Sequence, residues 1–299
     1  MKNAVKYYYR LEVDEIHQVN EIFEFKISNE KYMLCPYKKT TKEASEIYEL
    51  QKYLSIYRVY SHKIILNVKN SIITEINEEK YILIKNKLDD RIIDLSDILY
   101  LTRFNINPQK FPLITRKKWR ILWANKNDYI EYQMSQIGKI YPILRESMDY
   151  HIGIAETCIE LLNDINIDNY AYTIGHDRLY KNITTKEFYN PLNFILDNRS
   201  RDTGEFIKNI DKIEEQIKNI ELIKKSNMIK GLEYTMMFAR LMYPSIYFDI
   251  YEQIIEKKYK KEEFEQIVKN IENEEKKIKK IYRYINDICI IPKIEWLSE

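Results

Sequence analysis

The chain has 299 residues and a formal net charge of +2, because 48 Lys and Arg residues nearly balance 46 Asp and Glu residues. A chain of this length can bury a full hydrophobic core and most naturally forms one large or two modest domains. The basic residues are scattered through the sequence in the company of Glu, which argues against nucleic acid or an anionic membrane surface as a main partner.

Three cysteines lie far apart in the sequence, at Cys35, Cys158 and Cys289. Their odd number and their spacing do not fit a zinc site, so reduced thiols in a cytosolic protein are expected. The N-terminal stretch MKNAVKYYYRLEVDE lacks the apolar segment of a signal peptide, and no apolar run approaches the length that spans a bilayer. The sequence therefore predicts a cytoplasmic protein without membrane insertion.

Glycine is scarce in this chain. Average usage is about 7%, whereas the sequence contains 5 glycines and none in its first 137 residues. A phosphate-cradling loop needs glycines, because its backbone adopts positive φ and approaches the phosphates closely. Such a loop is therefore excluded from the N-terminal third.

The first third of the sequence reads as strands around one helix. IFEFKIS (22–28) and KYMLCPY (31–37) are β-prone runs separated by Asn29-Glu30, which predicts a hairpin. TTKEASEIYELQKYLSIY (40–57) begins with Thr, a favoured N-cap, and predicts a helix. The apolar residues at helical spacing in this segment are Ile47, Leu50 and Leu54.

Three further strands are expected after this helix. KIILNV and SIITEI are predicted to pair with each other across Lys69-Asn70, and KYILIK (80–85) follows a turn. A short polar connector, NKLDDR (86–91), then separates this β-rich part from the rest of the chain.

Beyond the connector the chain is predicted to be mostly helical. Helices are expected over 115–138 and 142–164, and a loop-rich section spans 165–199. The face of the first helix that should pack into the core carries Trp119, Leu122, Trp123, Ile130 and Met134. The last long helix should bury a stripe of Phe264, Ile267, Val268, Ile271, Ile278, Ile281 and Ile285.

The order of these elements indicates an α+β protein with two lobes. A small β-rich N-lobe with one helix (1–86) would be followed by a larger, mostly helical C-lobe (87–299). This arrangement is typical of a kinase-like fold, in which ligands lie between the lobes.

Three stretches carry a more specific resemblance. They are KWRILWANKNDYIEYQMSQIGKIYPILRESMDYHIGIAETCIELL (118–162), TIGHDRL (173–179) and FILDNRSRDTGEFIK (194–208). In order and spacing they resemble the spore-coat-associated CotS and YutH type proteins, within the aminoglycoside phosphotransferase and choline kinase branch of the kinase-like superfamily. The resemblance implies the two-lobed kinase-like fold.

Active members of that branch have the pattern H-G-D-x-x-x-x-N, in which Asp acts as base and Asn binds a metal. Two registers place GHDRLYKN (175–182) on this pattern. Aligned on spacing, Asp177 is the base and Asn182 the metal ligand. Aligned on His176, Arg178 takes the Asp position and Ile183 the Asn position, which abolishes the chemistry. We prefer the second register and expect Arg178, rather than Asp177, to face the cleft.

The resemblance also assigns the remaining site candidates. Asp197, in FILD, corresponds to a metal-binding Asp. The Lys that related kinases carry on the KYMLCPY strand is replaced by Cys35, and Glu46 or Glu49 on the following helix is a candidate for the partner of that missing Lys. A nucleotide, if bound, would lie at the connector, near Asn86 and Leu88.

Each of these residues also has a structural interpretation. His176 is expected to stabilise its loop through a hydrogen bond, and Asp177 and Asn182 are common turn residues. Asp197 can belong to an ion-pair network at the start of the next helix.

Together these observations predict a catalytically eroded kinase-like protein, a pseudokinase, that acts through protein–protein contacts. The resemblance implies that it is made in the mother-cell cytoplasm during sporulation, associates with the spore coat or other sporulation proteins, and needs no cofactor. The alternative is an active phosphotransferase that uses ATP and Mg²⁺ on a small hydroxyl substrate or a coat protein.

Overall fold

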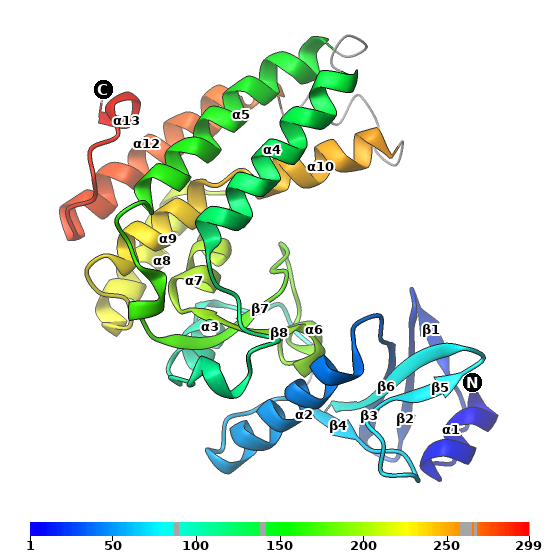
Figure 1. The fold of residues 1–299 in the computed structure, drawn as a ribbon. Helices are drawn as coiled ribbons and strands as arrows, with labels where there is room; N and C mark the ends of the chain where they lie inside the picture. Colours follow the sequence, from blue (N-terminus) through cyan, green and yellow to red (C-terminus); the bar gives the residue numbers. More distant parts are fainter. Residues whose placement is uncertain (87–89, 138–141, 257–264, 266–267, 299) are drawn as a thin grey trace. The chain divides into compact units, whose positions relative to one another are not determined.

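A computed structural model describes all residues except 87–89, 138–141, 257–264, 266–267 and 299 (Figure 1). The chain divides into two compact units. Unit 1 comprises Met1–Thr115 and Tyr172–Asp197, and unit 2 comprises Arg116–Ala171 and Asn198–Glu299. The predicted α+β class, with a small antiparallel sheet followed by a helical part, is confirmed. The predicted lobe boundary after residue 86 stays a prediction.

The main sheet of unit 1 is antiparallel and has the strand order β1-β2-β3-β6-β4, with β5 also paired to β6. Its strands are β1 (His17–Val19), β2 (Ile22–Ile27), β3 (Glu30–Pro36), β4 (Lys63–Ile65), β5 (Thr74–Ile76) and β6 (Glu79–Asn86). The predicted hairpin of β2 and β3 is confirmed. Its turn lies one residue earlier than expected, because Ile27 pairs with Glu30 and Ser28 adopts a positive φ of 54°.

The predicted pairing of KIILNV with SIITEI is wrong, because β4 and β5 both pair with β6 instead. Asn67 explains the difference. Its Oδ1 accepts hydrogen bonds from the backbone N–H groups of Lys69 (2.9 Å) and Ser71 (3.0 Å), and its Nδ2 donates to Thr74 Oγ1 at 3.0 Å. These side-chain bonds hold a wide loop in place of a two-residue turn.

Two helices pack on the sheet region of unit 1. α2 (Thr41–Ile56) begins with the predicted Thr40 cap, which forms a capping box with Glu43. α1 (Lys2–Tyr9) was not predicted; it buries Val5 and Tyr9 against a core that includes Phe25, and the Tyr9 hydroxyl lies 2.8 Å from Thr74 Oγ1.

The rest of unit 1 contains a second sheet of two strands, β7 (Tyr172–His176) and β8 (Phe194–Asn198). Short helices accompany it: α3 (Leu95–Thr102), η1 (Pro108–Lys110), α6 (Thr185–Phe188) and η3 (Pro191–Asn193). Isolated bridges join Ile92 to Thr184 and Thr115 to Leu196, so the segment after β7 is tied to earlier parts of the unit.

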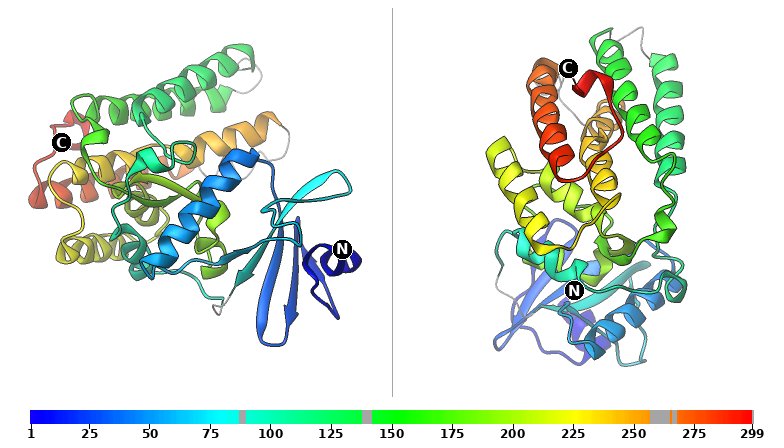
Figure 2. Two further views of the ribbon diagram at one scale, coloured as in Figure 1. Left: turned by 60° about the horizontal axis from the view of Figure 1, so that its bottom comes forward. Right: turned by 90° about the vertical axis from the view of Figure 1, so that its left-hand side faces the viewer.

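Unit 2 is helical. Its described elements are α4 (Trp119–Ile137), α5 (Pro142–Leu161), η2 (Ile167–Asn169), α7 (Ser200–Lys208), α8 (Ile213–Ser226), α9 (Glu233–Met242), α10 (Ser245–Ile255), α12 (Ile271–Ile288) and α13 (Glu295–Ser298). α4 and α5, both green, lie side by side in Figures 1 and 2. α9 is buried along nearly its whole length and contacts both α5 and α7.

Gly204 permits the close approach of α7 to α9. A Cβ atom at this position would lie 2.8 Å from the Met237 carbonyl oxygen and 3.0 Å from the Arg240 Cβ. Because a backbone carbonyl cannot move away cheaply, a larger residue would push the two helices apart.

The predicted core face of α4 is largely confirmed, since Trp119, Trp123, Ile130 and Met134 are buried. Leu122 is the exception, because its side chain is 52% exposed. In the last long helix Ile281 and Ile285 are buried as predicted, whereas the predicted positions Phe264 and Ile267 lie outside the described residues.

A network of charged side chains is buried in unit 2. Glu205 lies 2.7 Å from Arg240 Nε and 3.3 Å from Lys208 Nζ, and the three side chains are only 11–13% exposed. The Arg240 guanidinium also lies 5.5 Å from the ring of Trp119 and 5.7 Å from that of Trp123, within the range of cation–π attraction. Cys158 is fully buried in the same unit.

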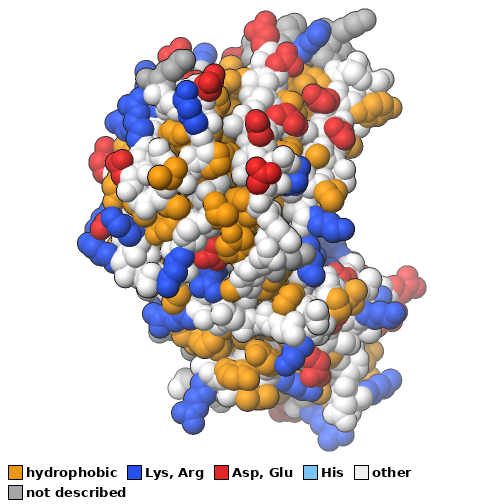
Figure 3. All heavy atoms as spheres, turned by 60° about the vertical axis from the view of Figure 1, so that its left-hand side comes forward, with side chains coloured by type: hydrophobic (Ala, Val, Ile, Leu, Met, Phe, Trp, Pro, Cys, Tyr) orange, Lys and Arg blue, Asp and Glu red, His pale blue; other side chains and the backbone are white. Residues whose placement is uncertain are grey.

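The surface mixes residue types. The face in Figure 3 carries hydrophobic side chains interspersed with both Lys or Arg and Asp or Glu, in agreement with the small net charge. Within the part of the chain that the structure describes, none of the helices has the length and apolar character needed to cross a bilayer.

Candidate functional site

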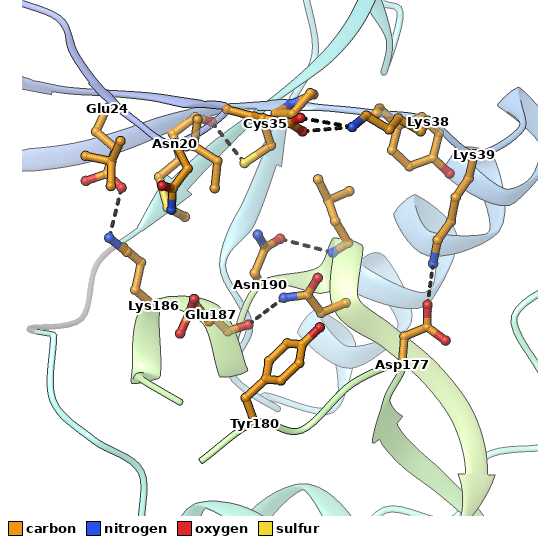
Figure 4. A pocket seen from close by; sticks show the side chains of 18 residues that line it. Asn20, Glu24, Cys35, Lys38, Lys39, Asp177, Tyr180, Lys186, Glu187 and Asn190 are labelled. Carbon is orange, nitrogen blue, oxygen red and sulfur yellow. Dashed lines mark hydrogen bonds and ion pairs between the residues drawn. The ribbon is translucent and has the colours of Figure 1, made fainter. Parts of the chain in front are cut away.

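A cavity of about 600 Å³ lies within unit 1. Its wall comes from the β1–β2 turn, from β2 and β3, from the segment that leads into α2, and from residues 177–193 (Figure 4). A second cavity of about 410 Å³ is lined by residues 14, 15 and 17, by parts of β2, β3 and β6, and by Lys186. Both volumes are in the range of about 300–1,000 Å³ that small-molecule sites occupy.

The β1–β2 connection on the rim of the larger cavity is a tight turn. Val19 pairs with Ile22, so only Asn20 and Glu21 form the turn, and Asn20 adopts a positive φ of 55°. This geometry agrees with the scarcity of glycine. A two-residue turn leaves little backbone N–H surface to surround phosphate groups, unlike the longer glycine-rich loops that do so.

Cys35 lies on β3, is 4% exposed, and lines the larger cavity. Burial raises the pKa of its thiol to about 12, although a hydrogen bond with the Asn190 side chain acts in the opposite direction. The thiol is therefore neutral at physiological pH, and β3 supplies no cation to the cavity at this position.

Three lysines line the larger cavity, and each one faces a carboxylate of the same cavity. Lys38 Nζ lies 2.9 Å from Glu21 Oε2, Lys39 Nζ 3.3 Å from Asp177 Oδ2, and Lys186 Nζ 2.8 Å from Glu24 Oε1. In Figure 4 the pairs of Lys39 and Lys186 lie at opposite ends of the cavity, with Cys35 and Asn190 between them. The positive charge of each lysine in this cavity is therefore balanced by a carboxylate of the same cavity wall.

Lys186 is the most enclosed of these lysines, because its side chain is 25% exposed against 34% for Lys39 and 77% for Lys38. Burial lowers its pKa, but the hydrogen bond and charge of Glu24, together with Asp90 and Glu187, outweigh that effect and raise the pKa. Lys186 is therefore firmly protonated.

His176 is a structural residue. It is 1% exposed, its Nε2–H donates to the Phe188 carbonyl oxygen at 2.7 Å, and its ring stacks on that of Phe188 with 4.2 Å between centroids. The bond to a carbonyl assigns the proton to Nε2, since a carbonyl oxygen only accepts. The imidazole of His176 therefore stabilises the position of α6 through its hydrogen bond to, and its stacking on, Phe188.

Asp177 and Arg178 differ from the sequence-based expectation. Asp177 lines the larger cavity and pairs with Lys39, whereas Arg178 is exposed and is not among the residues that line it. The expectation that Arg178 faces the cleft in place of Asp177 is therefore not met for this cavity. Which register describes the catalytic role stays a prediction, because the buried His176 fits one alignment and the position of Asp177 fits the other.

The two metal-ligand candidates lie in different surroundings. Asn182 is exposed with a positive φ of 58°, whereas Asp197 is completely buried in β8. Neither lines the larger cavity. Among the described residues no group of three or more His, Cys, Asp or Glu side chains is arranged to hold a metal ion.

Glu46 anchors a loop. Its Oε2 accepts hydrogen bonds from the backbone N–H groups of Leu113 (2.9 Å) and Ile114 (3.2 Å). Asn86 is 2% exposed at the end of β6 and lines the smaller cavity. Leu88 lies outside the described residues.

The residues as placed do not fit a magnesium–nucleotide complex of the usual kinase kind. The β3 position holds a neutral thiol, the turn is too short to surround phosphates, and the lysines already have carboxylate partners. Sequence reasoning missed Lys39, Lys186 and Glu24. No spacing rule connects Lys186 with Glu24, because the pair is separated by 162 positions and meets only through the fold.

Comparison with solved structures supports the fold. An aminoglycoside phosphotransferase from Alicyclobacillus acidocaldarius subsp. acidocaldarius DSM 446 matches with a TM-score of 0.72 at 10% identity, over 96% of each chain. An amicoumacin kinase in complex with AMP-PNP, Ca²⁺ and Ami matches with a TM-score of 0.60 at 11% identity, over 99% of this chain and 95% of that one.

A spectinomycin phosphotransferase in complex with ADP and spectinomycin matches with a TM-score of 0.59 at 10% identity, over 89% of this chain and 91% of that one. At such low identity these likenesses show the kinase-like fold alone. No curated protein sequence matches this chain. Residues 2–285 match the family model described as "Spore coat putative kinase YutH". The chain therefore belongs to the YutH family of kinase-like spore coat proteins.

Proposed function

We propose that this protein is a non-catalytic, kinase-fold component of the spore coat, which acts in sporulation through contacts with coat or other sporulation proteins. It would be made in the mother-cell cytoplasm and then join the coat. Membership in a spore coat family supports the proposed role in the spore coat. The ion pairs inside the cavity support the proposal that the protein transfers no phosphoryl group.

The observation that carries this proposal is the set of ion pairs inside the cavity. A kinase anchors nucleotide phosphates with a Lys on the strand equivalent to β3 and with metal ions. Here Cys35 is neutral on that strand, and Lys38, Lys39 and Lys186 already face carboxylates. A polyanionic nucleotide would have to break these pairs, so binding strong enough for catalysis is not expected.

A thermal-shift titration of the purified protein with ATP and ADP, with and without Mg²⁺, tests the proposal. A ligand at about 100 times its Kd stabilises the native state by roughly 2.7 kcal/mol, which raises the Tm visibly. We expect no Mg²⁺-dependent shift at millimolar ATP and no transfer of labelled γ-phosphate to protein. A Mg²⁺-dependent shift with phosphate transfer would contradict the proposal.

One observation favours the alternative, an active phosphotransferase on a small hydroxyl substrate or a coat protein. The Asp177 carboxylate lines the cavity, where it could accept a proton from a hydroxyl group if Lys39 moved away. The substitution Asp177→Asn, tested in sporulating cells, distinguishes the non-catalytic role from the enzymatic one. If the protein is non-catalytic, a fluorescent fusion with this change reaches the coat and the spores assemble as in the wild type; an enzyme would lose its phosphoryl transfer and the associated phenotype.

A further inference from the structure

The Lys186–Glu24 ion pair lies at the boundary of the two cavities of unit 1. Lys186, Glu24 and Met33 line both the larger and the smaller cavity, so the ion pair is part of the partition between them. The Glu24 carboxylate accepts a hydrogen bond of 2.8 Å from Lys186 Nζ, and both side chains are about one-quarter exposed. The partition is thus made of side chains that solvent can reach.

Lys186 lines the same cavity as the β3 position at which related kinases carry a Lys. Cys35 occupies the β3 position, and the positive charge of Lys186 acts on its thiol from the opposite wall of the cavity. β3 and α6 therefore share one cavity in which the neutral side chain comes from the strand and the ammonium from the helix. A ligand anion in this cavity would find its counter-charge on Lys186.

The backbone of Lys186 is held in place independently of Glu24. Its N–H lies 3.4 Å from Asp90 Oδ1, and its carbonyl oxygen accepts a 3.1 Å hydrogen bond from Nε2 of the buried His62. Asp90 Oδ2 is 4.0 Å from Lys186 Nζ, beyond hydrogen-bond distance, so Glu24 is the main carboxylate partner of the ammonium. A fixed, partly desolvated ammonium binds anions more strongly than one on a flexible, exposed side chain.

We propose that Lys186 is an anion-binding residue of this cavity, that the Glu24 carboxylate occupies its binding position, and that a phosphate-bearing ligand binds by displacing Glu24. This inference rests on the proposed function, because it describes binding without phosphoryl transfer at the same site. Removing the charge of Glu24 leaves the partly buried ammonium of Lys186 with only the more distant carboxylates of Asp90 and Glu187, which favours an anionic ligand at this position. The native protein is therefore self-blocked, and ligand binding opens the partition.

The test measures the binding of ATP and of inorganic pyrophosphate by isothermal titration calorimetry in the absence of Mg²⁺. We expect Glu24→Gln to lower the Kd about tenfold or more relative to the wild type. The Glu24→Gln/Lys186→Gln double variant should bind no more tightly than the wild type, and it removes both charges of the pair, so neither is left without the other. Tighter binding of ATP than of pyrophosphate would identify a nucleotide ligand, and equal binding a simple phosphate group.

Glu49→Gln is the matched control, because Glu49 Oε1 also accepts a 2.8 Å hydrogen bond from a lysine, Lys52, but on the surface of α2 outside both cavities. Its Kd should equal that of the wild type. If Glu24→Gln binds no more tightly than Glu49→Gln, or if the double variant keeps the increased affinity, the proposal is wrong. Mg²⁺-dependent phosphoryl transfer by the wild type would overturn the proposed function alone, since the binding test contains no metal.

Discussion

Units 1 and 2 each contain a set of basic side chains paired with carboxylates, one lining the larger cavity and one around Glu205, and the two sets lie at different depths. In unit 1 the side chains of Lys39 and Asp177 are 34% and 44% exposed. In unit 2 Glu205, Lys208 and Arg240 are only 11–13% exposed. An exposed pair can exchange its partner for water or a ligand, whereas a buried pair cannot separate without opening the core. The pairs in the cavity of unit 1 are therefore open to exchange with a ligand, whereas the charges around Glu205 in unit 2 are part of its core.

Among the substitutions considered, Glu205→Ala in unit 2 is expected to lower the free energy of unfolding the most. The change leaves Lys208 and Arg240 buried without their carboxylate, which should lower the free energy of unfolding by about 3–5 kcal/mol. Urea unfolding followed by tryptophan fluorescence measures this loss directly, because Trp119, Trp123 and Trp296 all belong to unit 2.

The control for this experiment is Glu215→Ala. Glu215 lies 3.8 Å from Lys212, and the two side chains are 58% and 74% exposed. A loss of about 1 kcal/mol or less is expected for such a surface pair. If Glu205→Ala costs no more than Glu215→Ala, the distinction between buried and exposed charge pairs does not hold.

An acid-dependent loss of stability should occur in both units, because each contains a histidine whose pKa is lowered by burial. Burial lowers the pKa of His62 in unit 1 and of His151 in unit 2 to about 4. His62 donates from Nε2 to a carbonyl oxygen, and His151 donates from Nδ1 to the Ser147 carbonyl oxygen at 2.6 Å while its ring stacks on Tyr247.

The unfolded chain takes up a proton on each histidine below pH 6.5, whereas the folded chain does so only near pH 4, so stability falls as the pH decreases through this window. Each histidine contributes at most about 3 kcal/mol to the loss. Urea midpoints between pH 4 and 8 measure the effect. His151→Gln should flatten the part of the profile reported by tryptophan fluorescence, and an unchanged profile would exclude His151 as a cause.

The smallest effect is expected for Glu24→Gln on stability. Lys186 and Glu24 are 25% and 27% exposed, and the Gln amide oxygen can still accept the hydrogen bond, so the free energy of unfolding should fall by about 1 kcal/mol or less. Circular dichroism during urea unfolding gives this value. A fall of about 3 kcal/mol in the free energy of unfolding would instead show that the Lys186–Glu24 pair stabilises the fold as the buried charges around Glu205 do.

Much of the fold follows from local sequence signals. Thr40 starts α2, the β2 and β3 runs form a hairpin, and the spacing of Trp119, Trp123 and Ile130 marks the core face of α4, as predicted. The pairing of β4 and β5 with β6 could not be predicted, because it depends on the hydrogen bonds that the Asn67 side chain makes inside a loop. Leu122 fits an apolar pattern but lies on the exposed face of its helix.

The site was less predictable than the fold. Composition alone excluded a glycine-rich loop, and the resemblance to a family placed Cys35 and Asp177 among the candidates that line the cavity. The pairing of lysines with carboxylates depends on side chains that are distant in sequence, such as Glu24 and Lys186. Sequence periodicity reports which face of an element is buried and carries no information on such contacts.

The buried thiols give each unit a reporter of its own opening. Cys35 in unit 1 and Cys158 in unit 2 are shielded from solvent, and burial raises the pKa of each thiol above its ordinary value. Reagents that attack thiolates will therefore modify them only when the surrounding structure opens transiently. The modification rate at each position, read by mass spectrometry, measures the local opening free energy of each unit within a single sample.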